Sequence, residues 1–180
     1  MSFLLIERPR PHVALVTLNR PDRMNAMAFD VMLPLRRAIE ELSVDNDVRV
    51  VVLTGAGEGF CSGADQADAG APPHIDGLTP VSIALRALQV LDDVMLALRD
   101  MHQPVIGAIN GAAIGGGLCL SLGCDIRVAS TKAYFRAAGI NNGLTASELG
   151  LSYLLPRVIG QARAAEIMLT GRDVDAAEAE

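Results

Sequence analysis

Aromatic residues are scarce in this sequence: they make up 3% of its 180 residues, and tryptophan is absent. Because 51% of the residues are nonetheless apolar, a core must be built mainly from aliphatic side chains. Charged residues account for only 20%, which excludes a disordered chain, since disordered segments combine low hydrophobicity with high charge. The length suffices for one globular domain, and we expect residues 1–180 to form a single one.

Basic clusters are also lacking. The formal net charge is −6, and the longest run of basic residues is the pair Arg36-Arg37. Nucleic-acid binding requires a basic surface that neutralises phosphates, so no nucleic-acid partner is expected. The uncharged stretch 103–124 has the length of a membrane span, but Pro104, Asn110 and six glycines make it a poor transmembrane helix. No membrane association is expected either.

Cysteine is rare. The three cysteines are Cys61, Cys119 and Cys124, and their spacing matches no metal-ligand pattern. An odd number without such spacing predicts reduced thiols in a reducing compartment. The N-terminal residues do not show the order of regions found in secretory signal peptides. We therefore expect a cytoplasmic protein without a bound metal.

Short apolar runs alternate with amphipathic segments along the chain. The runs 3–7 and 13–18 flank RPRPH and predict a β-hairpin. Apolar residues spaced by three or four predict helices. Strands are predicted over 3–7, 13–18, 48–54, 104–110 and 125–130, and helices from Phe29 onward, over 84–98 and over 118–123. This alternation is typical of an α/β fold with mostly parallel strands.

Three segments are predicted to lie outside these elements. Residues 55–65, GAGEGFCSGAD, follow a strand and predict a glycine-rich loop, and residues 67–80 predict a mobile surface loop. The last residues, DAAEAE (175–180), predict the start of a helix capped by Asp175. The protein is expected to continue beyond Glu180.

The segment GAAIGGGLCLS (111–121) holds three consecutive glycines between two apolar stretches. A dinucleotide-binding turn is excluded, because Leu120 occupies the place of the last glycine and no acidic residue follows at the required distance. A phosphate-binding P-loop lacks its Gly-Lys-Ser/Thr, and a hydrolase nucleophile elbow lacks its GxSxG. These glycines therefore do not indicate a nucleotide site or a hydrolase triad.

The remaining functional interpretation is a turn that stabilises an anion. Glycines at the start of a helix let backbone N–H groups point at a ligand, with the positive end of the helix behind them. A second small-residue turn, FCSGAD (60–65), also follows a predicted strand. One N–H from each turn could bind the same oxyanion. The alternative is that both are ordinary tight turns.

Several segments together resemble the enoyl-CoA hydratase/isomerase (crotonase) family. They are NRPDRMNAM (19–27), VVLTGAGEGFCSGAD (51–65), QPVIGAINGAAIGGG (103–117), CDIRVAS (124–130) and LPRVIGQARAAEIMLTGR (155–172). The resemblance implies a spiral of β-β-α units with mostly parallel strands, followed by a C-terminal helical part beyond residue 180. It also implies an acyl-CoA thioester substrate, with CoA as part of the substrate rather than a cofactor, and assembly as homotrimers or hexamers.

Four residues are assigned roles through this resemblance. Ala64 and Gly116 should supply the two backbone N–H groups of an oxyanion hole. Arg23 is expected to contact the CoA phosphates, with a solvated loop arginine as the alternative. Asp65, in the same ligand-binding loop, is expected to accept hydrogen bonds from neighbouring backbone amides rather than to transfer protons.

The sequence departs from the family pattern at the two glutamates with which hydratases activate water. The corresponding positions hold Cys119 and Gly139. A two-glutamate hydration mechanism is therefore not expected. Cys119 is interpreted as a small core residue; the alternative, a substitute base, is disfavoured because a buried thiol without a cationic partner has a raised pKa.

One carboxylate, Glu148, stands in the following segment TASELGLSYLLPR (145–157). Its position resembles a third site, where dienoyl-CoA isomerases and a benzoyl-CoA dehalogenase branch carry a catalytic aspartate. The alternatives are a helix cap and a solvated residue. A single carboxylate can move a proton between carbons while the hole holds the enolate, and burial would raise its pKa toward neutrality.

The sequence therefore predicts an acyl-CoA enzyme that isomerises a double bond, with Glu148 as acid and base. Three alternatives stay open: hydration by an atypical mechanism, acyl-CoA binding without turnover, and a purely structural subunit.

Overall fold

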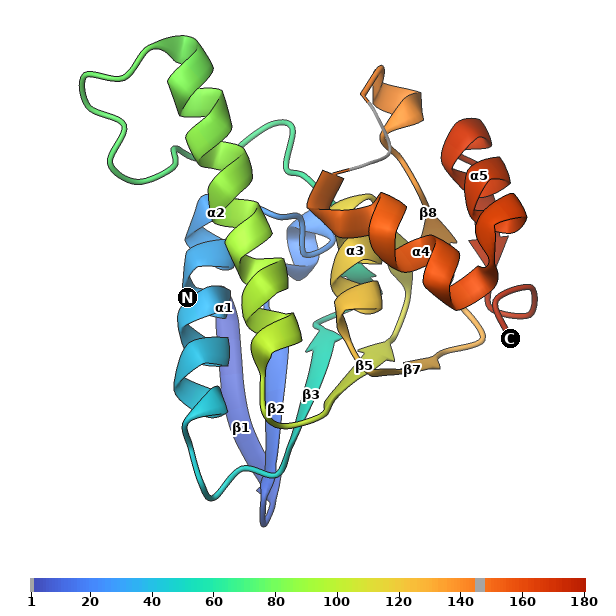
Figure 1. Cartoon of the computed structure of the whole chain (residues 1–180). Helices are drawn as coiled ribbons and strands as arrows, with labels where there is room; N and C mark the ends of the chain where they lie inside the picture. Colours follow the sequence, from blue (N-terminus) through green and yellow to red (C-terminus); the bar gives the residue numbers. More distant parts are fainter. Residues whose placement is uncertain (1, 145–147) are drawn as a thin grey trace.

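The computed structural model describes residues 2–144 and 148–180. Within them, strands and helices alternate and form two sheets covered by helices (Figure 1). The larger sheet has the order β1-β2-β3-β5-β7. Its strands are β1 (Leu4–Arg10), β2 (Val13–Leu18), β3 (Val50–Gly55), β5 (Val105–Ile109) and β7 (Ile126–Ala129). β1 and β2 pair antiparallel, which confirms the predicted hairpin, and the other pairs are parallel.

The smaller sheet has the order β4-β6-β8-β9. Its three-residue strands are β4 (Gly59–Cys61), β6 (Ala112–Ile114), β8 (Tyr134–Arg136) and β9 (Asp173–Asp175). The pairs β4–β6 and β6–β8 are parallel, and β8–β9 is antiparallel. Mostly parallel strands are what the sequence predicted.

The helices are α1 (Phe29–Ser43), α2 (Pro80–Asp100), α3 (Gly116–Gly123), α4 (Leu151–Ile159) and α5 (Gln161–Thr170), with 3₁₀ turns η1 (Pro21–Arg23), η2 (Ile140–Asn142) and η3 (Glu148–Gly150). Three times in succession the chain places one strand in the larger sheet, the next in the smaller sheet, and then a helix. These units are β3-β4-α2, β5-β6-α3 and β7-β8-α4. The repetition confirms the predicted α/β spiral of β-β-α units.

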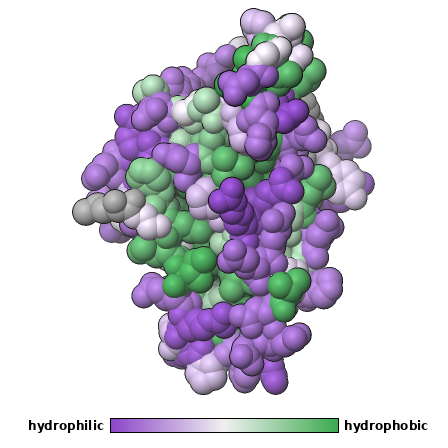
Figure 2. Space-filling model, turned by 90° about the vertical axis from the view of Figure 1, so that its left-hand side faces the viewer, coloured by the Kyte–Doolittle hydropathy of each residue, from purple (hydrophilic) through white to green (hydrophobic). Residues whose placement is uncertain are grey.

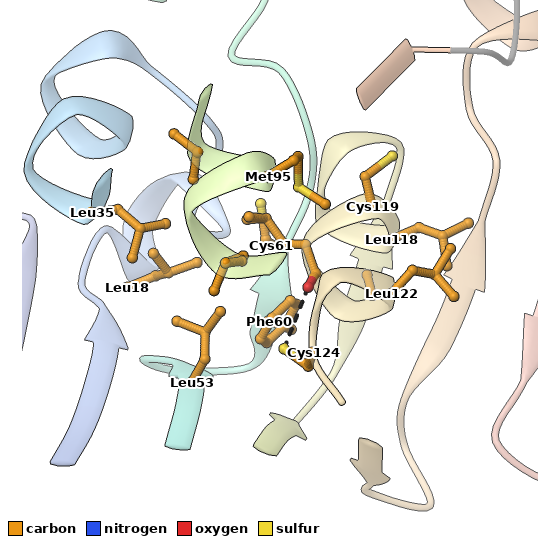
Figure 3. Packing of buried hydrophobic residues seen from close by; sticks show 14 of the residues in the cluster. Leu18, Leu35, Leu53, Phe60, Cys61, Met95, Leu118, Cys119, Leu122 and Cys124 are labelled. Carbon is orange, nitrogen blue, oxygen red and sulfur yellow. Dashed lines mark hydrogen bonds between the residues drawn. The ribbon is translucent and has the colours of Figure 1, made fainter. Parts of the chain in front are cut away.

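The core lies between the larger sheet and the helices. β2 and β3 each alternate buried and half-buried residues, as expected of strands that present one face to a core. Leu35 of α1, Leu53 of β3 and the fully buried Phe60 of β4 belong to one cluster of buried apolar residues (Figure 3). Burial raises the pKa of the Cys61 and Cys124 thiols to about 12, so both are protonated at neutral pH.

Several predicted boundaries differ from the structure. The segment predicted as one glycine-rich loop contains β4, and β6 lies just before the glycine triplet. α3 begins at Gly116 rather than at Leu118, so two of the three glycines are helical. The last residues form a turn and not a helix; the Asp175 carboxylate accepts a hydrogen bond from the Glu178 N–H (2.8 Å).

The uncharged stretch 103–124 folds as β5, β6 and the eight-residue α3. No helix in the described part of the chain is long and apolar enough to cross a membrane. On the face shown in Figure 2, hydrophobic surface gathers in patches between hydrophilic side chains. The large exposed apolar residues of the chain include Val81 and Leu85, in the first half of α2.

Candidate active site

Two turns of small residues meet at one edge of the smaller sheet. β4 and β6 are adjacent parallel strands, with Cys61 paired to Ala113. Ala64 follows the end of β4 and Gly116 follows the end of β6, so both lie beyond the carboxyl ends of their strands, where ligands bind in α/β sheets. A Cβ atom placed on Gly63 would lie 3.4 Å from the Gly116 nitrogen. The two turns are therefore in contact.

The Gly116 N–H stands at the start of α3. The preceding Gly115 has φ +52°, a left-handed conformation that few side chains tolerate. The first hydrogen bond of the helix runs from the Cys119 N–H to the Gly115 carbonyl (3.1 Å). Within the described residues the Gly116 N–H has no acceptor. It is a donor at the positive end of the helix, and Gly116 is half-buried.

The Ala64 N–H takes no part in the hydrogen bonds of the local β-bridge between Met27 and Ala64. The Met27 N–H donates to the Gly63 carbonyl (2.7 Å), and the Asp65 N–H donates to the Met27 carbonyl (3.0 Å). This pairing uses the groups on either side of Ala64 and directs its own N–H away from Met27. Residue Ala64 is exposed, and its N–H has no acceptor within residues 2–144 and 148–180. Two N–H groups from adjacent turns can stabilise one developing oxyanion.

Close packing explains why this helix begins with glycines. A Cβ atom on Gly117 would overlap the Cys61 carbonyl oxygen, so α3 lies directly against β4. A Cβ atom on Gly116 would overlap the Met27 sulfur and lie 3.2 Å from Leu149 Cδ1. Any side chain at either position would displace one of these neighbours.

The segment of Glu148 borders the same helix start. Leu149 is buried and adopts φ +52°, a strained conformation for a branched side chain. Because its Cδ1 atom lies close to Gly116, η3 passes beside the Gly116 turn. The side chain of Glu148 lies outside the described part of the structure, as do residues 145–147.

The two positions at which hydratases carry glutamates lie beside the site, and neither holds a carboxylate in this chain. Cys119 lies one turn after Gly116, is 2% exposed and belongs to the core cluster, which confirms it as a core residue (Figure 3). Gly139 precedes η2. Its neighbour Ala138 lies 3.7 Å from where a Cβ atom on Gly115 would be.

Asp65 is the centre of a buried ionic cluster beside Ala64. Its carboxylate accepts hydrogen bonds from the Ala67 and Asp68 amides (3.1 and 2.9 Å), so the backbone contacts expected of it are present. Arg23 lies 2.6 Å from one carboxylate oxygen, and Arg20 lies 3.0 Å from the other. The hydrogen bond from Arg23, with those from the two amides, lowers the pKa of Asp65 to about 2. Asp65 is therefore ionised at neutral pH.

Arg23 thus forms an ion pair within the chain, with Asp65. Its side chain is 43% exposed, however, and it shares the Asp65 carboxylate with Arg20, while the Asp68 carboxylate also attracts its charge. Arg20, which no sequence pattern indicated, has a side chain that is 9% exposed and lies over the Phe3 ring (5.3 Å to the centroid).

Asn25 is a second residue that sequence reasoning missed. It is fully buried with φ +54°, and its side-chain amide donates to the carbonyls of Ala56 (2.9 Å) and Gly59 (2.8 Å). Its carbonyl oxygen accepts a hydrogen bond from the Arg20 N–H (2.8 Å). These bonds fasten the loop before α1 to the start of β4. In the described residues, no group of three or more His, Cys, Asp or Glu side chains could hold a metal ion.

Comparison with known proteins places the chain in a family. The family model for enoyl-CoA hydratase/isomerase matches residues 9–180. The chain is 69% identical over 180 residues to the probable enoyl-CoA hydratase echA12 of Mycobacterium bovis, covering all of this chain and 63% of that protein.

Comparison with solved structures supports the same family. A probable enoyl-CoA hydratase/isomerase from Mycobacterium abscessus is 72% identical and superimposes with a TM-score of 0.95, over all of this chain and 66% of its own. A protein from M. smegmatis described as a monofunctional enoyl CoA isomerase is 62% identical, with a TM-score of 0.82, over all of this chain and 73% of its own. The chain thus spans less than two thirds of the length of the first two relatives. It belongs to the enoyl-CoA hydratase/isomerase family.

Proposed function

We propose that this chain binds an acyl-CoA thioester and stabilises its enolate between the backbone N–H groups of Ala64 and Gly116. The observation that carries the proposal is the pair of N–H groups without an acceptor in the described residues, on adjacent turns beyond two parallel strands. Donors fixed in this way need no reorganisation when negative charge develops on the thioester oxygen.

The proposed reaction is migration of a double bond. The base removes a proton from one carbon of the acyl chain, the electrons move onto the thioester oxygen, and the proton returns to another carbon. One carboxylate is enough for both transfers, and Glu148 is the proposed acid and base. The lack of carboxylates at Cys119 and Gly139, and the M. smegmatis relative described as a monofunctional isomerase, support this reaction over hydration.

Hydration is the second candidate. It is favoured by the names of two relatives, the probable enoyl-CoA hydratase of M. bovis and the (E)-benzylidenesuccinyl-CoA hydratase of Thauera aromatica, which is 42% identical over 171 residues. With neither glutamate present, water would have to be activated by a different arrangement. Binding of acyl-CoA without turnover is a third outcome, which the same experiment distinguishes.

Arg23 is proposed to attract the phosphates of CoA. The Arg23 guanidinium is 43% exposed next to the proposed hole, where a phosphate can reach it. In this scheme Asp65 holds Arg23 in place and does not transfer protons. Assembly into trimers or pairs of trimers is a further prediction, which the sedimentation of the purified protein measures.

The test is to incubate the protein with 2-enoyl-, 3-enoyl- and dienoyl-CoA and to follow bond migration and water addition separately. We expect bond migration without substantial hydration. Glu148→Gln should remove at least about 10²-fold of the activity, a typical contribution of a general acid–base. Glu41→Gln, an exposed carboxylate on α1, is the matched control and should retain it.

Two results would contradict the proposal. Rapid hydration of 2-enoyl-CoA would favour the second candidate, and unchanged turnover by Glu148→Gln would exclude the single-carboxylate mechanism. Absence of any binding of acyl-CoA by the wild-type chain would reject both ligand-based functions.

A further inference from the structure

Met27 is the residue through which the two turns are connected. Its backbone holds the first turn from both sides of Ala64, by the hydrogen bonds to the Gly63 carbonyl (2.7 Å) and from the Asp65 N–H (3.0 Å). Its side chain extends to the second turn, where the sulfur occupies the space that a side chain on Gly116 would need. One residue therefore contacts both N–H-bearing turns.

The position of the Met27 side chain is closely restricted. Residue Met27 is 4% exposed and belongs to the core cluster. Both its sulfur and its methyl carbon Cε lie close to Gly116, since a Cβ atom on that glycine would overlap the first and lie 3.2 Å from the second. Leu149 Cδ1 also lies 3.2 Å from that position. Two apolar side chains thus lie beside Gly116.

We propose that Met27 is a positioning residue that sets the separation of the Ala64 and Gly116 N–H groups. The inference rests on the proposed function, because it concerns the same two donors. A hole of two donors acts fully only when both reach the same oxygen, and misplacement by about 1 Å can cost about 10²-fold in rate. Met27 fixes the distance between the two N–H groups, because its backbone is hydrogen-bonded to the turn of Ala64 and its side chain contacts Gly116.

Three variants test this role. Met27→Ala keeps the backbone bridge but removes the contact with Gly116, so the two turns can move relative to each other. Met27→Leu keeps most of the apolar volume and should restore much of the function. Met95→Ala is the matched control: Met95 is 6% exposed, and its Cε atom lies 3.0 Å from where a Cβ atom on Gly123 would be, at the opposite end of α3.

The first readout needs no turnover. Acetoacetyl-CoA ionises to an enolate, which absorbs in the ultraviolet, more readily when an oxyanion hole stabilises the charge. We expect Met27→Ala to lower the enolate fraction of the bound ligand and to reduce kcat by about 10- to 100-fold, with KM changed much less. Met95→Ala should lower the unfolding midpoint to a similar extent and leave both measurements unchanged.

The outcomes separate this inference from the proposed function. If wild-type protein binds no acetoacetyl-CoA, the proposed function fails, and the role of Met27 fails with it. If wild-type protein binds and ionises the ligand while Met27→Ala does so equally well, only the positioning role is overturned. An equal loss of ionisation in Met95→Ala would also overturn it, because the effect would then reflect general packing of α3.

Discussion

The two ends of α3 differ in the hydrogen bonds that the rest of the chain makes with them. At the C-terminal end, Arg127 donates to the carbonyls of Ser121 (3.3 Å) and Cys124 (2.7 Å), and the Cys124 thiol donates to the Leu120 carbonyl (3.4 Å; Figure 3). At the N-terminal end, the Gly116 N–H has no acceptor within the described residues.

This difference separates stability from function within one eight-residue helix. Polar groups at a helix end are usually satisfied by caps, side chains or water. The C-terminal end of α3 follows this rule through protein contacts, whereas at the half-buried N-terminal end two apolar side chains lie beside Gly116 and its N–H has no acceptor in the described residues. We interpret the C-terminal end as structural and the N-terminal end as the ligand-binding end.

The comparison predicts the largest effect for Gly116→Ala. The added methyl group would overlap the Met27 sulfur and displace either that side chain or the N–H itself. We expect turnover of the acyl-CoA substrate to fall by about 10²–10³-fold, the cost of losing one oxyanion-hole donor. Steady-state kinetics measure it.

Gly123→Ala is the control for this prediction. At the other end of the helix the added methyl group would meet the flexible end of Met95 at 3.0 Å and the Leu98 Cδ1 atom at 3.4 Å, and no backbone atom within that distance. Activity should be retained. Equal losses in the two variants would mean that the two ends do not differ in function.

The next largest effect is expected for Asp65→Asn, beside the other proposed donor. The variant removes the charge that holds Arg20 and Arg23, so we expect a lower urea midpoint at pH 7 and weaker binding of CoA thioesters. The folded-state pKa of about 2 lies below the unfolded value of about 3.9. The stabilisation is therefore present above pH about 4 and is lost as the pH falls toward 2.

Urea unfolding at several pH values checks the direction of this dependence. The difference in midpoint between the wild type and Asp65→Asn should narrow as the pH falls from 4 to 2. A difference that stays constant over this range would show that the Asp65 charge does not stabilise the fold.

Arg127→Ala should affect stability alone. It removes two charge-assisted hydrogen bonds, both from one guanidinium nitrogen, to the carbonyls of Ser121 and Cys124, which we expect to cost about 1–3 kcal/mol in the free energy of unfolding. Acyl-CoA binding and kcat should be unchanged. A fall in kcat without loss of stability would contradict the assignment of this end as structural.

The smallest effect is expected for Ser121→Ala. The fully buried Ser121 hydroxyl donates to the Leu118 carbonyl within the helix (2.7 Å). Its loss should cost about 0.5–1.5 kcal/mol, partly offset by the higher helix propensity of alanine. Thermal unfolding measures the change, and a loss above about 3 kcal/mol would mean that the hydroxyl supports more than this one carbonyl.

The longer elements could be predicted because their sequence periodicity is strong. β2 and β3 are continuous β-branched and aliphatic runs, and α1 shows apolar residues at helical spacing. β4, β6, β8 and β9 have only three residues each, which is too short for any periodicity to appear. Their strand conformation depends on pairing with segments far away in the sequence.

The candidate site was predictable only in part. Ala64 and Gly116 were selected through the family resemblance, since a backbone donor leaves no signal in side-chain chemistry beyond small size. Met27 resembles any apolar residue next to a turn, and its contact with Gly116 is a tertiary one. The Arg20 ion pair with Asp65 joins residues 45 positions apart, so no local pattern could indicate it.

The repeated strand-strand-helix unit has a consequence for how this protein can change over time. The proposed donors are main-chain groups, each placed by the same step of the repeat, just after a strand of the smaller sheet. Side chains around them can therefore be exchanged without removing the group that polarises the thioester. Loss of two glutamates would then alter which reaction is catalysed while keeping the machinery for forming an enolate, so new activities can be reached by few substitutions.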